Sequence, residues 1–149
     1  MSRAGGQALS LCRQTSCLAV PASLGTLLAF LEATCKEAGL DDEAAFAVRL
    51  AGEEACSNII NHAYRGTEPG PILLDVRCDD AQVVLLIEDR APVFKPADAP
   101  PPDLTGDWEQ RREGGLGWHL IRQMMDEVRH EQVAGGGNRL QMVKRLRAH

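Results

Sequence analysis

The period of the hydrophobic pattern changes along this chain, and that change constrains the fold more than any other feature. Between residues 24 and 63, apolar side chains recur every three to four positions, which predicts two helices. Between residues 71 and 88 they alternate or run continuously, which predicts two strands joined at Asp79-Asp80. Helices followed by neighbouring strands, rather than a strict alternation of the two, are typical of an α+β fold.

Turn and capping residues divide the rest of the chain. The expected elements are a strand at 8–18, a helix from Pro21 to about Gly39, a longer helix from Asp41 or Asp42 to the break at 66–70, strands at about 71–78 and 82–88, a helix after Gly117, and strands at about 127–133 and 139–147 that turn through 135–138. The longer helix is expected to bury a stripe made of Phe46, Leu50, Ala51, Ala55, Ile59 and Ala63. The continuous apolar run from Val83 to Ile87 predicts a central, buried strand. This order predicts a two-layer sandwich, with a mixed, mostly antiparallel sheet and helices on one face.

The length of the chain and its prolines predict the domain organisation. The 149 residues fit one domain, expected at 8–149 after a flexible tail at 1–7. Five of the eight prolines lie between residues 92 and 102, so regular structure is not expected there. Residues 90–113 are therefore predicted to form a long loop, and a loop of this length in a compact domain is usually functional or disordered.

Charge and cysteine content argue against several classes of protein. The net charge is −5 and basic residues do not cluster, which argues against nucleic-acid binding. No stretch approaches the roughly 18 consecutive apolar residues of a membrane span, and the N-terminus lacks the apolar run of a signal peptide. The five cysteines include no C-x-x-C pair, so reduced core thiols are expected. These features predict a cytoplasmic protein.

Three polar residues of the longer predicted helix are candidates for a functional site. Glu54, Asn58 and His62 recur every four positions, so they lie on nearly one face beside the apolar stripe. An asparagine carbonyl is a natural ligand for a hard cation, and a glutamate one turn away can act as a general base. The alternative is a solvated edge of an amphipathic helix, and the helix alone does not decide between the two.

Two further candidates follow the predicted strands at about 71–78 and 82–88. Asp89 comes directly after the buried apolar run, where its carboxylate can accept hydrogen bonds from a ligand; the alternative is an aspartate that only ends a strand. Residues 114–117, Gly-Gly-Leu-Gly, open a predicted helix, where exposed backbone N–H groups suit a phosphate. The alternative there is a flexible hinge without a ligand.

In this order the motifs resemble the GHKL ATPase superfamily, which includes gyrase and histidine kinases, and more narrowly the anti-sigma-factor serine kinases. Residues 54–64 match the family's N-box almost throughout, and residues 89–94 match its adenine-binding motif D-x-G-x-x-F. Residues 114–121 match its phosphate-binding box, and the closing segment 137–146 is also similar. The resemblance covers roughly residues 9–147 and implies a histidine-kinase-like ATPase fold.

The resemblance implies ATP and Mg²⁺ as ligands and assigns a role to each motif. Asn58 is implied as the Mg²⁺ ligand, Glu54 as the catalytic base for the attacking hydroxyl, and Asp89 as the acceptor for the adenine amino group. Residues 90–113 are implied as the lid over the nucleotide. Further nucleotide contacts are implied for Ala91, Phe94, Arg111 or Arg112, Gly115, Leu116 and Gly117.

The implied activity is that of a protein-serine kinase that regulates transcription by partner switching. Its partners would be an anti-anti-sigma (STAS-type) protein, which it phosphorylates on a serine, and a sigma factor, which it holds inactive. The first helix and the edge strand are candidates for a homodimer face, because members of the family often dimerise.

Two departures from the family pattern keep alternatives open. Ala91 stands where the family has glycine, and Lys95 stands where an acidic residue is common. An added methyl in a tight site costs about 1–3 kcal/mol, which would weaken nucleotide binding by about tenfold or more. The alternatives are a nucleotide-dependent binding module without kinase turnover, and a domain that has lost ATP binding and only sequesters a partner.

Overall fold

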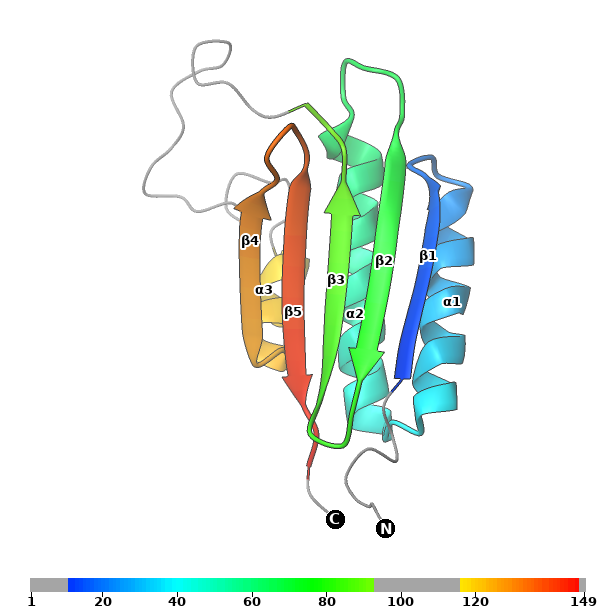
Figure 1. Ribbon diagram of the computed structural model, residues 1–149, viewed down its shortest axis with the longest axis vertical. Helices are drawn as coiled ribbons and strands as arrows, with labels where there is room; N and C mark the ends of the chain where they lie inside the picture. The colour runs from blue at the N-terminus through cyan, green and yellow to red at the C-terminus, as the bar shows by residue number, and fades with distance from the viewer. Residues whose placement is uncertain (1–10, 93–115, 148–149) are drawn as a thin grey trace.

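The computed structural model describes residues 11–92 and 116–147, which form a five-stranded sheet with helices on one of its faces (Figure 1). The elements in order are β1 (Leu11–Leu18), α1 (Ser23–Ala38), α2 (Asp42–Asn58), the π-helical turn η2 (Ile59–Ala63), β2 (Pro71–Cys78), β3 (Gln82–Asp89), α3 (Leu116–Met124), β4 (Glu127–Gln132) and β5 (Asn138–Arg145). This order and the one-sided layer of helices confirm the predicted α+β sandwich. Among the described helices, none is long and apolar enough to cross a membrane.

The strand order of the sheet is β1-β2-β3-β5-β4, and each of the four pairings is antiparallel. Because β3 and β5 are antiparallel neighbours, the C-terminal end of β3 lies beside the start of β5, and Asp89 pairs with Asn138. This pairing places residues 49 positions apart in the chain at one end of the sheet. The predicted central position of β3 is confirmed.

Capping residues set the end of α1 and the start of α2 where the sequence predicts. The Asp41 carboxylate accepts a hydrogen bond from the backbone N–H of Ala44 at 2.8 Å, so Asp41 is the N-cap of α2. Gly39 takes the left-handed conformation at the C-terminus of α1, with φ 72°, which glycine adopts without steric cost. These two caps fix the short connection that folds α2 back along α1.

The buried stripe of α2 includes Ala51 and Ala55, as predicted, but not Phe46. Phe46 is 57% exposed, and the core face instead carries small residues. The buried residues of this helix are Ala44, Ala47, Val48, Ala51, Gly52, Ala55 and Cys56. Position 46 lies two residues, or about 200°, from positions 44 and 48, so both faces cannot be buried together. The face that carries small residues is buried because it lets α1 approach closely. A Cβ added at Gly52 would lie 2.2 Å from Leu31 Cδ1.

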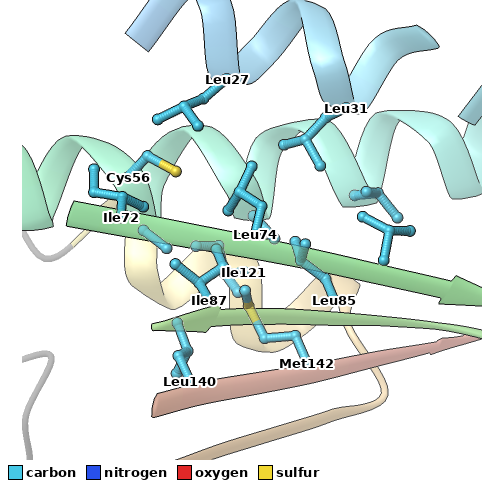
Figure 2. Close-up of a cluster of buried hydrophobic side chains, with 14 of the residues drawn as sticks. Leu27, Leu31, Cys56, Ile72, Leu74, Leu85, Ile87, Ile121, Leu140 and Met142 are labelled. Carbon is cyan, nitrogen blue, oxygen red and sulfur yellow. The ribbon is translucent and has the colours of Figure 1, made fainter. Parts of the chain in front are cut away.

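The main core lies between the helices and the sheet (Figure 2). Side chains of β3 alternate between this core and the open face of the sheet, so Val83, Leu85 and Ile87 are buried. Val84 and Leu86 point to the open face and are only half-buried, because no described helix covers that side. By the same alternation, Asp89, two residues after Ile87, faces the layer between the sheet and the helices.

The cysteines of the described residues are free thiols. Cys35, Cys56 and Cys78 are buried, as predicted for core thiols, whereas Cys12 is exposed. Burial raises the pKa of Cys35 to about 11 and that of Cys56 to about 12, so both stay protonated at neutral pH. These thiols pack as small apolar side chains.

Candidate functional site

The end of α2 changes its hydrogen-bonding geometry where the candidate site begins. The α-helix ends at Asn58 and continues as the π-helical turn Ile59–Ala63. A π-helical turn inserts an extra residue into the helical repeat and often occurs at functional sites. Asn58 and His62 both line the cavity described below, whereas Glu54 is not among its lining residues. Two of the three candidates therefore line the same cavity.

A cavity of about 220 Å³ lies between the end of α2, η2, β3 and the β4–β5 pair. Its lining residues are Ala55, Asn58, Ile59, His62, Ala63, Ile87, Asp89, His130, Asn138 and Leu140. Half of these side chains are apolar and the others are polar. An apolar cavity with a few convergent polar groups is the usual form of a small-molecule site.

Asp89 is a buried carboxylate with one oxygen engaged. Its side chain is in a residue only 4% exposed, and its Oδ1 accepts hydrogen bonds from the N–H of Ala91 at 2.9 Å and from Nδ2 of Asn138 at 3.2 Å. Within residues 11–92 and 116–147, no hydrogen bond reaches Oδ2. Because Asp89 lines the cavity, Oδ2 is suited to accept a hydrogen bond from a ligand there.

Asn58 carries a buried polar group that the described residues leave without a partner. Its Nδ2 is shielded from solvent and makes no hydrogen bond with them. Such a group costs about 1–3 kcal/mol, so its presence beside a cavity indicates a ligand rather than a packing role. The two ends of the amide exchange by rotation, and the oxygen end is a ligand of the kind that Mg²⁺ prefers. The residues present therefore fit a hard cation bound together with a substrate.

Tyr64 joins the start of β2 to the residue that follows Asp89. Its hydroxyl donates to the carbonyl of Pro71 at 2.8 Å and accepts from the N–H of Arg90 at 2.7 Å. Burial raises the pKa of Tyr64, so the hydroxyl keeps its proton for the first of these bonds. A Cβ at Gly70 would lie 2.7 Å from the ring, so the ring requires glycine at that position.

Replacing Tyr64 with phenylalanine is expected to lower the free energy of unfolding by about 1–3 kcal/mol. The N–H of Arg90 would lose its acceptor and the carbonyl of Pro71 its donor, while the ring would still fill its place. Urea unfolding followed by circular dichroism measures the change. An unfolding curve identical to that of the wild-type protein would contradict this role of the hydroxyl.

The turn between β4 and β5 supplies site residues that the sequence analysis did not single out as functional. Gly137 has φ 111°, and a Cβ there would lie 2.3 Å from the backbone carbonyl oxygen of Asp89. The close approach brings the next residue, Asn138, against the Asp89 carboxylate. The signals in the sequence are the run Gly-Gly-Gly-Asn at 135–138, which predicts a turn, and the similarity of 137–146 to the family, which assigns no role to these two residues.

Ala91, for which the family resemblance implies a nucleotide contact, does not line the cavity. The residue is 1% exposed, belongs to the hydrophobic core and is absent from the cavity lining. Its backbone does not take a positive φ, so alanine fits there without strain. Among the described residues, the methyl group of Ala91 therefore packs in the core and does not block the cavity.

Several predicted nucleotide contacts lie outside the described residues. These are Phe94, Arg111, Arg112, Gly114 and Gly115, together with most of the predicted lid at 90–113. Leu116 and Gly117 are the first residues of α3, so the predicted start of this helix after the glycine run is confirmed to within two residues.

Comparisons with known proteins agree with this architecture. The family model described as histidine kinase-like ATPase domain matches residues 17–144. The serine-protein kinase RsbW of Listeria monocytogenes is 32% identical over 111 residues, which cover 72% of this chain and 69% of that protein. The RsbW kinase of Bacillus pumilus is 29% identical over 134 residues, or 86% of this chain and 82% of the relative.

A solved structure gives the same fold. The structure of the RsbU and RsbW domains of a Mycobacterium tuberculosis protein matches 91% of this chain with a TM-score of 0.65 and 20% sequence identity. This chain spans only 32% of that longer chain, so the similarity concerns the fold alone. Since the family model and the Listeria relative both cover most of this chain, it belongs to the histidine kinase-like ATPase domain family and is similar within it to the RsbW serine-protein kinases.

Proposed function

We propose that this chain is an ATP-dependent protein-serine kinase whose nucleotide site is the cavity lined by Asn58 and Asp89. The observation that carries the proposal is that one cavity is lined both by Asn58, whose buried Nδ2 has no partner among the described residues, and by the buried residue Asp89, whose Oδ2 receives no hydrogen bond from them. A buried polar group such as Nδ2 of Asn58 lowers stability unless a ligand binds it, and Oδ2 of Asp89 offers the same ligand an acceptor. The relatives named serine-protein kinases support the choice of reaction.

The end of the cavity at Asp89 suits the adenine base. Oδ2 of Asp89 would accept a hydrogen bond from the exocyclic amino group, in a position that water reaches poorly. Apolar side chains of the lining, among them Ile87 and Leu140, would contact the faces of the ring. A base held in this way would direct the ribose and phosphates along η2 and the start of α3.

The phosphate end would be organised by Asn58 and by the start of α3. The amide oxygen of Asn58 would hold Mg²⁺, which when bound neutralises charge on the phosphates. No cluster of three acidic, histidine or cysteine side chains in the described segments could hold a metal alone, so phosphate oxygens would complete its coordination. The backbone N–H groups of 115–117 would face the phosphates, as at other helix N-termini.

Glu54 is the proposed general base. It lies one helical turn before Asn58 on α2 and is half-buried, so its carboxylate lies on the same side of the helix as the proposed metal ligand. It would accept the proton of the serine hydroxyl as that oxygen attacks the terminal phosphate. The remaining catalysis would come from positioning and charge neutralisation, as is usual for phosphoryl transfer.

The proposed protein substrate is an anti-anti-sigma protein of the STAS type, and a sigma factor is the proposed second partner. A homodimer through α1 and β1 stays a prediction of the family resemblance. A second candidate function is a nucleotide-dependent binding module without turnover. It is supported by the absence of Glu54 from the described cavity lining.

Transfer of label from γ-³²P-ATP distinguishes the two functions. The purified chain, Mg²⁺ and each STAS-domain protein of the same organism would be combined, and phosphoserine identified by mass spectrometry. Glu54→Gln is expected to lower transfer by about 10²–10⁴-fold, because a general base typically contributes that much, while ATP binding is retained. Glu53→Gln is the matched control: Glu53 is the neighbouring residue, is half-buried and lies 3.9 Å from Arg49 in an ion pair, and its variant is expected to keep transfer.

Two results would contradict the kinase. Equal transfer by Glu54→Gln and the wild-type protein would remove Glu54 from the mechanism. Tight ATP binding without label on any STAS-domain protein would leave the binding module as the function.

A further inference from the structure

We propose that Asn138 is a specificity-determining residue, which together with Asp89 reads the hydrogen-bonding edge of the base and selects adenine over guanine. The inference rests on the proposed nucleotide site and adds a residue to it. Asn138 lines the cavity, is the first residue of β5, and pairs with Asp89 across the β3–β5 ladder.

The orientation of the Asn138 amide follows from its partner. A carboxylate oxygen only accepts hydrogen bonds, so the NH₂ end of the amide faces Oδ1 of Asp89, at 3.2 Å. That NH₂ group has two hydrogens, and one of them is used in this bond. The second hydrogen is available to a ligand in the cavity that both residues line.

The backbone of the β4–β5 turn keeps this amide in place. Gly137 approaches the backbone of Asp89 so closely that any side chain would collide with it. Asp89 itself is held by the N–H of Ala91 at 2.9 Å. The donor of Asn138 and the acceptor of Asp89 are therefore fixed relative to each other before a ligand binds, and preorganised groups discriminate better than mobile ones.

The pair presents an acceptor, Oδ2 of Asp89, next to a donor, the free N–H of Asn138. The corresponding edge of adenine carries the opposite pattern, with the amino group as donor and ring nitrogen N1 as acceptor. Guanine and hypoxanthine carry an oxygen and an N–H in those two places. The oxygen would face the acceptor Oδ2 of Asp89, and the N–H would face the donor of Asn138, so neither contact could be a hydrogen bond. Buried polar groups left unpaired in this way reject an analogue far more strongly than a missing apolar contact does.

Binding of three nucleotides measured by calorimetry tests this assignment. The ligands are ATP, 1-deaza-ATP, in which a C–H group replaces N1, and inosine triphosphate. The wild-type protein is expected to bind 1-deaza-ATP about tenfold more weakly than ATP, as for the loss of one hydrogen bond, and inosine triphosphate at least about a hundredfold more weakly. Asn138→Ala is expected to bind ATP and 1-deaza-ATP equally, because the variant has no donor for N1.

Gln141→Ala is the matched control, since it removes an amide from the same strand on the open face of the sheet. It is expected to keep the preference for ATP over 1-deaza-ATP. Equal binding of the two nucleotides by the wild-type protein would overturn the role of Asn138 and leave the nucleotide site intact, even if Asn138→Ala does not fold. Absence of ATP binding to the wild-type protein would overturn the nucleotide site itself and this inference with it.

Discussion

Replacing Gly137 with alanine is expected to destabilise the protein by about 2–5 kcal/mol and to abolish nucleotide binding. The new methyl group would lie 2.3 Å from the carbonyl oxygen of Asp89 and 3.2 Å from Cα of Arg90, and both are backbone atoms of the central strand or its extension. They cannot move without shifting the Asp89 side chain. Urea unfolding and calorimetric titration with ATP measure the two effects.

Gly136→Ala is the control that separates two effects of Gly137→Ala: the collision with the backbone of Asp89, and the strain of an alanine at positive φ. Gly136 lies in the same turn and also has a positive φ, 117°, but a Cβ there meets nothing within 4 Å. This control is expected to lose only about 1–2 kcal/mol, the usual cost of the left-handed region, and to keep ATP binding. Equal losses in the two variants would show that the approach to Asp89 is not what makes Gly137 necessary.

Replacing Asn58 with alanine is expected to change stability and nucleotide binding in opposite directions. The variant removes a buried Nδ2 that has no partner in the described residues and places a better helix former at the end of α2. Its free energy of unfolding without ligand is therefore expected to be unchanged or higher by about 1 kcal/mol. Its affinity for ATP with Mg²⁺ is expected to fall at least about tenfold, and the dependence on Mg²⁺ to disappear.

Asn61→Ala is the control for this change, because Asn61 lies in the adjacent turn η2 and is exposed. Neither stability nor Mg²⁺-dependent binding is expected to change in that variant. A loss of several kcal/mol in Asn58→Ala, with ATP affinity unchanged, would show that the amide has a structural role instead.

The sequence predicts the elements well because their ends depend on neighbouring residues. Asp41 caps α2 by bonding to a residue three positions away, and Gly39 ends α1 by its own conformation. The predicted stripe is confirmed at Ala51 and Ala55 but wrong at Phe46, because more than one set of apolar positions in α2 has helical spacing. The choice between them depends on how closely α1 approaches at Gly52, which is a contact between distant residues.

The same distinction applies to the site. Asn58 and Asp89 could be found because each belongs to a motif of contiguous residues. Tyr64, Gly137 and Asn138 lie within segments that resemble the family, at 54–64 and 137–146. They act through contacts with residues 26 to 49 positions away, so the motifs alone do not show what each of them does. The effect of Ala91 could not be judged from sequence either, because a methyl group at that position faces the core.

Calorimetric titration of ATP, with and without Mg²⁺, into the wild-type protein and Asp89→Asn tests the central claim most directly. In the variant the amide oxygen can still accept from Ala91 and Asn138, but an NH₂ group replaces Oδ2 and would face the amino group of adenine. Micromolar binding that Mg²⁺ strengthens, and that Asp89→Asn loses while it stays folded, is the predicted result. Absence of binding at millimolar ATP, or equal binding by both proteins, would contradict the assignment of this cavity to the nucleotide.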